Sequence, residues 1–179
     1  MHGIIFDQLH EFTTQTYGRE AWTAMVARPE AARSTYFVGE EYPDEELEGL
    51  LSAASTLTGR SRDELLEDFG HFIVPGLLDL YGVLVDPKWD LLGFLEGIEE
   101  TIHRVVRLRH PGARPPRLEA TRTGPDQVTI VYTSQRKMCF LAKGIIRGLE
   151  EHYSESVSVS DTSCMNKGDD ICIMIVERL

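Results

Sequence analysis

The sequence has no long apolar run and few basic residues. No segment approaches the roughly 20 consecutive apolar residues of a membrane-spanning helix, although 42% of its 179 residues are hydrophobic. Only 18 lysines and arginines accompany 29 acidic residues, so the formal net charge is -11. A negative surface repels nucleic-acid phosphates and anionic lipids. We therefore expect a globular protein that binds neither nucleic acid nor membrane.

Cysteine is scarce as well, since only Cys139, Cys164 and Cys172 are present. An odd number of cysteines is typical of a reducing compartment rather than of a disulfide framework. The N-terminal segment MHGIIFDQLHEF has early acidic residues and no basic region, unlike a signal peptide. Together these features predict a cytoplasmic protein.

The first 110 residues have the apolar spacing of helices. Apolar side chains recur every three or four positions, which predicts helices over about residues 3–16, 17–27, 44–58, 61–73 and 89–109. Gly59 is placed to end one helix, and a capping-box pattern of Ser61 and Glu64 begins the next. Pro75 and Gly76 are expected to kink or break that helix.

Beyond residue 110 the pattern becomes that of strands. Residues 117–123 and 127–134 alternate with period two around a Gly-Pro-Asp turn, and 156–162 and 171–177 form a second pair. Residues 137–153 return to helical spacing. The predicted class is α+β, with one domain over residues 1–179. A helical lobe (1–110) precedes a lobe with a four-stranded antiparallel sheet and a helix (111–179).

The most specific polar pattern is Tyr132-x-Ser134-x-Arg136. Side chains alternate along a strand, so these three would point to one side, with neighbours about 7 Å apart. All three donate hydrogen bonds and together could grip paired carboxylates, with the guanidinium as a charged fork. The alternative is a polar strand face turned toward water.

His103 lies at the margin of the apolar face of the helix predicted over residues 89–109. Imidazole is a common axial ligand of haem iron, but a histidine in such a position is also an ordinary, partly exposed residue. Periodicity does not separate it from the other histidines of the chain, which are His2, His10, His71, His110 and His152.

His103 and the Tyr132-x-Ser134-x-Arg136 triplet, which begins 29 residues later, together resemble the H-NOX family of haem nitric-oxide/oxygen binding domains. The resemblance covers essentially the whole chain, including Met1-x-Gly3, Phe69-Gly70 and Pro115-Pro116-Arg117. It implies an H-NOX-like fold with haem b as cofactor. His103 would be the iron ligand, the triplet would bind the haem propionates, and Pro116 would press on the porphyrin and distort it.

The same resemblance implies an apolar pocket on the other face of the haem. Family members that hold oxygen carry a tyrosine at the position of Leu141, and some relatives carry a polar residue at the position of Ile73. Bound O₂ needs a hydrogen-bond donor, on which NO and CO depend far less. We therefore expect NO and CO binding, with poor retention of O₂, in a pocket lined by Ile5, Leu9, Ile73, Leu77, Leu141 and Ile145.

The resemblance further implies a stand-alone sensor rather than an enzyme. NO would weaken or break the bond to His103, and the lobes would shift against each other. The shift would reach a separate signalling protein, such as a histidine kinase or a diguanylate cyclase. Two alternatives stay open, namely the same fold holding another large apolar or tetrapyrrole ligand, and a zinc or thiol redox sensor.

The three cysteines could share a site, because Cys164 and Cys172 flank the turn of the last predicted hairpin. Three thiolates and a fourth ligand suit tetrahedral zinc. Some H-NOX relatives resemble this arrangement and bind zinc, with a histidine at the position of Asp161. Asp161 is therefore the candidate fourth ligand. Free thiols, or a disulfide with one spare thiol, are the alternatives.

Overall fold

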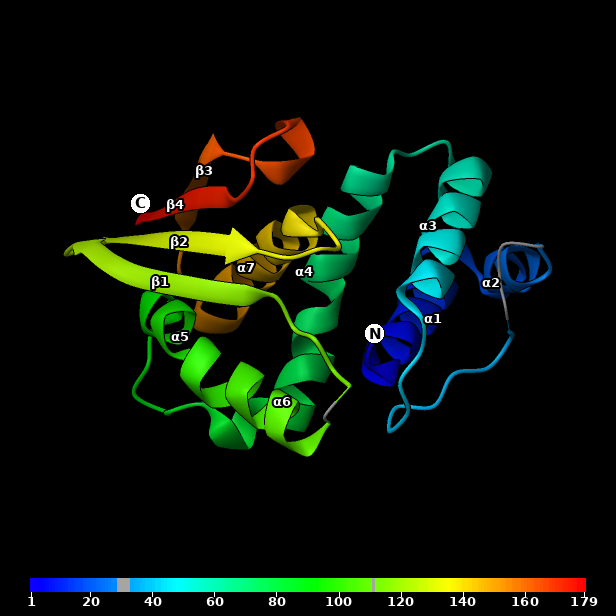
Figure 1. Cartoon of the computed structure of the whole chain (residues 1–179), viewed down its shortest axis with the longest axis horizontal. Coiled ribbons are helices and arrows are strands. Elements are labelled where there is room, and N and C mark those ends of the chain that lie inside the picture. The colour runs from blue at the N-terminus through cyan, green and yellow to red at the C-terminus, as the bar shows by residue number, and fades with distance from the viewer. Residues whose placement is uncertain (29–32, 111) are drawn as a thin grey trace.

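Helices form the first half of the chain, and a four-stranded sheet with one long helix forms the rest (Figure 1). The computed structural model describes residues 1–28, 33–110 and 112–179. The helices are α1 (Gly3–Tyr17), α2 (Arg19–Val26), α3 (Asp44–Thr58), α4 (Arg62–Tyr81), η1 (Gly82–Leu84), α5 (Leu91–Gly97), η2 (Glu99–His103), α6 (Arg104–Arg109), α7 (Cys139–Tyr153) and η3 (Met165–Lys167). The strands are β1 (Arg117–Gly124), β2 (Gln127–Thr133), β3 (Val157–Ser163) and β4 (Cys172–Arg178). The predicted α+β class is confirmed.

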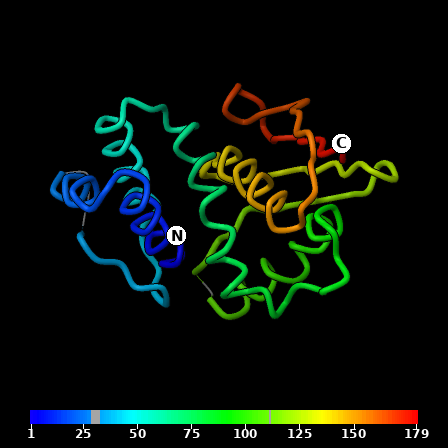
Figure 2. Tube along the Cα trace, turned by 180° about the vertical axis from the view of Figure 1, so that it is seen from behind, coloured from blue at the N-terminus to red at the C-terminus, as the bar shows by residue number. Residues whose placement is uncertain are grey.

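The sheet is antiparallel throughout, with the strand order β1-β2-β4-β3. Its centre is therefore β2 beside β4, where Tyr132 pairs with Cys172. Alternate residues of these two strands are buried, as period-two patterning requires. Helix α7 crosses one face of the sheet, as the view from behind shows (Figure 2).

Helices α4 and α7 pack unusually closely because glycines face each other across the contact. A Cβ added at Gly70 would overlap the carbonyl oxygen of Leu141, and one added at Gly144 would overlap the carbonyl oxygen of Glu67. Only a residue without a side chain permits such an approach between two backbones. This contact explains the Phe69-Gly70 step of the sequence.

The described residues form two apolar cores, and α4 contributes to both. Phe69 and Ile73 lie in a core with α1, α2 and α3, whereas Val74 lies in a core with α5, α7 and the sheet. Because α5 packs on the sheet, the two cores do not divide the chain at residue 110. Residue 111, where the second lobe was expected to begin, lies outside the described residues.

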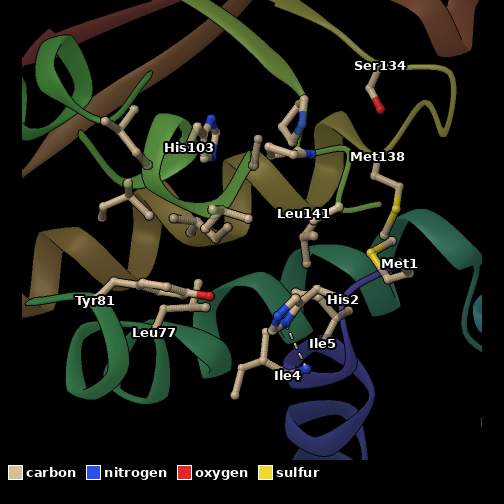
Figure 3. A pocket seen from close by; sticks show the side chains of 18 of the residues that line it. Met1, His2, Ile4, Ile5, Leu77, Tyr81, His103, Ser134, Met138 and Leu141 are labelled. Atoms are coloured by element: carbon tan, nitrogen blue, oxygen red, sulfur yellow. Dashed lines mark hydrogen bonds between the residues drawn. The ribbon is translucent and has the colours of Figure 1, made fainter. Parts of the chain in front are cut away.

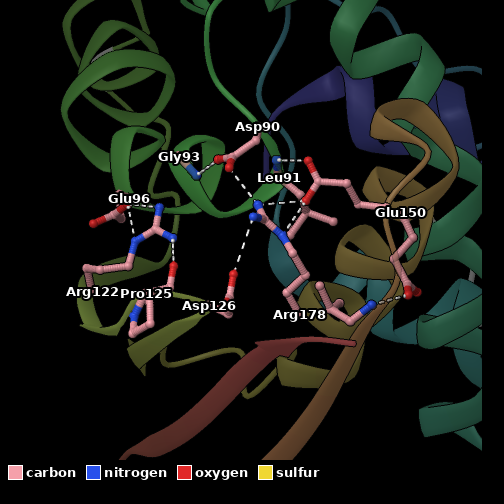
Figure 4. Close-up of polar contacts among 11 residues, drawn as sticks. Asp90, Leu91, Gly93, Glu96, Arg122, Pro125, Asp126, Glu150 and Arg178 are labelled. Carbon is pink, nitrogen blue, oxygen red and sulfur yellow. Dashed lines mark hydrogen bonds and ion pairs between the residues drawn. The ribbon is translucent and has the colours of Figure 1, made fainter.

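Ion pairs join α5 and its N-cap to two strands of the sheet, β4 and β1 (Figure 4). The Arg178 guanidinium in β4 lies 2.5 Å from Asp90, whose carboxylate also caps α5 by accepting from the Gly93 N–H. Farther along α5, Glu96 lies 2.6 Å from Arg122 in β1. Helix α5, which leads to His103, is therefore held to the sheet near both of its ends.

Two helices differ from the expectation. Helix α4 continues through Pro75 to Tyr81, because the apolar residues Val74 and Leu77 on either side of the proline are held by packing that outweighs one lost hydrogen bond. The helix predicted over residues 89–109 contains a π-helical turn, η2, in which the His103 N–H donates to the Ile98 carbonyl at 3.1 Å. Among the described residues, no helix combines the length and hydrophobicity of a membrane span.

Candidate functional site

A largely apolar pocket of about 200 Å³ lies between the two cores. Helices α1 and α4 form one wall, while η2, α6 and the loop before β1 form the opposite wall (Figure 3). The five residues predicted to hold a cofactor all line this pocket, although they are spread over 34 positions of sequence; they are His103, Pro116, Tyr132, Ser134 and Arg136.

His103 ends the π-helical turn and faces the pocket (Figure 3). Its Nδ1 lies 2.9 Å from Glu99 Oε2, and both side chains are mostly buried, at 14% and 20% exposed. With Nδ1 engaged by a carboxylate, Nε2 is the ring nitrogen free to face a ligand. Single-turn π-helical insertions recur at functional sites because they re-aim a side chain.

The Glu99 carboxylate contacts three other residues. Glu99 was not among the predicted site residues. Besides His103, its carboxylate accepts from Arg107 Nη2 at 2.5 Å and from the Leu118 N–H at 3.3 Å. Burial opposes ionisation, but the hydrogen bonds from His103 and Arg107 hold the pKa of Glu99 below its usual range. A charged acceptor on Nδ1 fixes the imidazole orientation and makes Nε2 a stronger electron donor. The sequence did carry one sign of this contact, because residues four positions apart on a helix, such as Glu99 and His103, lie side by side.

The polar triplet does not continue along a single strand, because β2 ends at Thr133. Tyr132 is buried on the strand, and burial raises the pKa of its phenol to about 12. Ser134 lies in the turn that follows, where its Oγ accepts from the Arg136 N–H at 3.2 Å. The predicted straight row is therefore bent, yet all three side chains still line the pocket.

Arg136 is held in place from outside the pocket. Its side chain is 13% exposed, and its Nε lies 2.8 Å from Asp44 Oδ2. Its Nη1 donates to the Arg114 carbonyl. Asp44 also pairs with the N-terminal amine of Met1 at 3.0 Å, so this single carboxylate joins the start of α3, the start of the chain and the pocket arginine.

The model of the haem-NO-binding family matches residues 2–161. The chain belongs to the haem-NO-binding (H-NOX) family.

Two guanylate cyclases are similar to this H-NOX chain. Soluble guanylate cyclase 89Da of Drosophila melanogaster is 22% identical over 138 residues, which are 76% of this chain and 20% of the cyclase. Soluble guanylate cyclase gcy-31 of Caenorhabditis elegans is 22% identical over 154 residues, 84% of this chain and 22% of the cyclase. The chain therefore spans about a fifth of the length of these cyclases.

Solved H-NOX structures share the whole fold. The H-NOX protein of Shewanella oneidensis in its Fe(II)NO state superposes with a TM-score of 0.92 at 24% identity, covering 100% of this chain and 99% of the other. The unliganded Fe(II) H-NOX protein of K. algicida superposes with a TM-score of 0.90 at 24% identity, covering 100% and 97%. The H-NOX-like fold predicted from the sequence is confirmed.

The residues around the H-NOX pocket fit haem. Haem is a flat apolar ring that carries two carboxylates and an iron that accepts an imidazole. The two walls of the pocket are mostly apolar, His103 offers an imidazole from one wall, and Tyr132, Ser134 and Arg136 add two hydroxyls and a guanidinium to the lining. Pro116 belongs to the loop before β1, which is part of the wall that carries His103.

The wall opposite His103 differs in part from the expectation. Ile5, Leu77, Leu141 and Ile145 line the pocket as predicted, but Leu9 and Ile73 do not. These two side chains are fully packed in the first core, because Leu9 lies one helical turn beyond Ile5 and Ile73 points about a quarter turn away from the pocket face of α4.

His2 lines the same wall of the H-NOX pocket and was not singled out from the sequence. It is 8% exposed and accepts the Ile4 N–H at its Nδ1 as the N-cap of α1. A histidine before an apolar helix carries no sequence signal that it faces a pocket, so only the packing of α1 against α4 and the loop reveals it.

The three cysteines form a buried cluster where α7, η3 and β4 begin. Their sulfur atoms all lie within 4.8 Å of one another, and Cys139 Sγ lies 3.7 Å from Cys164 Sγ. Burial raises the pKa of Cys139 and of Cys172, which keeps these thiols protonated when no cation is near.

Asp161 is not part of the cysteine cluster, contrary to the expectation of a fourth ligand. Its Oδ2 lies 2.5 Å from Lys143 Nζ, and both side chains are mostly buried. Among the described residues, the group within metal-binding reach contains the three cysteines alone. The lysine on α7 is the physical reason, since it draws the carboxylate into an ion pair.

Proposed function

We propose that this H-NOX protein senses nitric oxide through haem and signals to a separate protein after His103 is released. The supporting observation is that one apolar pocket brings together His103 and the Tyr132, Ser134 and Arg136 side chains. When bound, haem b supplies a ferrous iron that takes a diatomic gas. His103 would hold the iron through Nε2, the triplet would hold the propionates, and Pro116 would press on the ring.

The residues around His103 would carry its movement outward. His103 belongs to the π-helical turn, and Glu99 connects that turn to Arg107 in α6 and to Leu118 in β1. A displaced imidazole would disturb all three contacts at once. The surface formed by α6 and β1 would then change, which a partner such as a histidine kinase or diguanylate cyclase would read.

The opposite wall would set the choice of gas. Ile5, Leu77, Leu141 and Ile145 offer no hydrogen-bond donor from their side chains, and NO and CO depend on such a donor far less than O₂ does. We therefore propose NO and CO as ligands, with weak retention of O₂. The low and odd cysteine count supports a cytoplasmic location, and the proposed role is that of a sensor rather than of an enzyme.

Haem titration of the apoprotein tests the proposal. Wild type should bind haem with a ferrous absorption spectrum typical of histidine ligation, and His103→Ala should lose or change that spectrum. His152→Ala, which removes a histidine at the exposed end of α7, is the matched control and should match wild type. Equal haem spectra for His103→Ala and wild type would refute the role of His103, and a wild type without any haem spectrum would favour a binding module for another ligand.

The cysteine cluster favours a second, metal-binding role. Zinc bound to thiolates at about 2.3 Å in a tetrahedron separates the sulfurs by about 3.8 Å, and Cys139 and Cys164 lie 3.7 Å apart. We propose that Cys139, Cys164 and Cys172 hold structural zinc, with Asp161 outside the ligand set. The thiol redox alternative predicts instead that oxidant forms a disulfide here and that zinc leaves stability unchanged.

A further inference from the structure

His2 is a buried polar residue in a wall whose other side chains are apolar except for Tyr81 at the end of α4. Figure 3 shows His103 on one side of the pocket and His2, Ile5 and Leu77 on the other. The rings of His2 and His110 pack in a T-shaped arrangement, with centroids 4.2 Å apart. The imidazole of His2 is thus held between the N-terminus of α1 and His110 while it faces the cavity.

The hydrogen bonding of His2 fixes which nitrogen carries its proton. Burial lowers the pKa of His2, with the nearby His110 acting in the same direction, so the neutral ring is favoured. In a neutral ring one nitrogen donates and the other accepts. Since Nδ1 accepts the Ile4 N–H at 3.4 Å, the proton belongs on Nε2.

That Nε2–H is buried and has no hydrogen-bond partner among the described residues. A buried donor left without an acceptor is unfavourable, and native proteins almost always supply one. The acceptor is therefore expected to arrive with a ligand. The haem carboxylates are a poor candidate for that acceptor, because Ser134, one of the triplet that would hold them, lies away from His2, Ile5 and Leu77 (Figure 3).

We propose that His2 is a specificity-determining residue, which donates a hydrogen bond from Nε2 to the gas held on the face of the haem opposite His103. The inference rests on the proposed function for the haem and His103 and changes its expectation for O₂, because a donor from His2 would strengthen the binding of O₂ more than that of NO or CO. His2 would act as a donor rather than as a second iron ligand, since ligation needs the proton moved to Nδ1 and the cap of α1 broken.

The C–O stretching frequency of the ferrous CO complex tests the proposal. His2→Asn keeps a side-chain acceptor for the Ile4 N–H, because Asn is a favoured N-cap, but is too short to bring an N–H into the cavity. The frequency should shift upward in His2→Asn, since the bound gas loses a donor. His2→Gln, which restores an N–H at greater reach, should bring it back toward the wild-type value. His10→Asn, on the same helix but outside the pocket lining, should leave it unchanged.

Two results would overturn this inference alone. One is an unchanged frequency in His2→Asn with a normal haem spectrum. The other is a six-coordinate ferrous spectrum without gas that His2→Asn abolishes, since that would make His2 an iron ligand. Failure of the wild-type protein to bind haem or CO would appear in its absorption spectrum and would refute the proposed function, and this inference with it.

Discussion

Replacing Glu99 by Gln is expected to weaken the bond between His103 and iron while the protein still binds haem. Gln keeps the size of the side chain, but its amide is a weaker acceptor for His103 Nδ1 than the carboxylate that now lies 2.9 Å away. It also cannot serve His103 and Arg107 with two acceptor oxygens, as the carboxylate does.

The magnitude follows from the three contacts of Glu99. Hydrogen bonds to charged groups contribute about 1.5–3 kcal/mol, but Arg107 is 40% exposed and its share is small. We expect the apoprotein to lose about 1–2 kcal/mol of unfolding free energy, mainly through His103 and the Leu118 N–H. If about 1 kcal/mol of this also stabilises the iron–histidine bond, release of His103 becomes about fivefold more favourable.

Resonance Raman spectroscopy of the ferrous protein is the assay, because the iron–histidine stretching frequency reports the strength of that bond. The frequency should fall in Glu99→Gln, and urea unfolding should show the loss of stability. Glu100→Gln is the matched control, since Glu100 lies on the same π-helical turn. Its side chain is 79% exposed, and its ion pair with Arg104 is long, at 3.7 Å. An unchanged frequency in Glu99→Gln, or an equal fall in Glu100→Gln, would refute the reasoning.

Three further predictions concern the fold and the metal. Gly144→Ala should destabilise the protein by about 1–3 kcal/mol in urea unfolding, because its Cβ overlaps a carbonyl of α4; Gly82→Ala, whose Cβ meets nothing within 4 Å, should be neutral. The Gly93 N–H and Arg178 hold the pKa of Asp90 below its usual value, so its ionised form contributes stability that is present at neutral pH and lost as the pH falls through that lowered pKa. Asp90→Asn, which keeps the cap, should therefore be less stable at neutral pH and lose less stability than wild type between about pH 5 and 3; a parallel loss would contradict this. Zinc should raise the melting temperature of wild type and release protons, and Cys164→Ser should remove both effects; equal zinc effects in the variant would rule out the cluster.

Local patterning predicted the elements well. The two hairpins, α7 and most of the helices follow from apolar spacing and turn residues, and the strand pairing of β1 with β2 follows from the Gly-Pro-Asp turn. These features depend on neighbours in sequence, which is why a single sequence suffices. The residues matched to the family, His103 and the Tyr132-x-Ser134-x-Arg136 triplet, all reach one pocket.

Other features depend on contacts between distant segments. The π-helical turn lies between α5, which packs on the sheet, and α6, and no spacing rule signals its extra residue. Leu9 and Ile73 pack in the first core instead of the pocket, because Leu9 lies one helical turn beyond Ile5 and Ile73 points about a quarter turn away from the pocket face of α4. Asp161 turns to Lys143, a residue 18 positions away that periodicity could not pair with it.

The most direct test of the central claim is the absorption spectrum of the purified ferrous protein before and after NO is added. The account predicts a haem spectrum with one histidine ligand, which changes on addition of NO to that of a five-coordinate complex as His103 is released. A protein that binds no haem would contradict the cofactor assignment. A six-coordinate NO complex in a protein that still signals would contradict the release of His103.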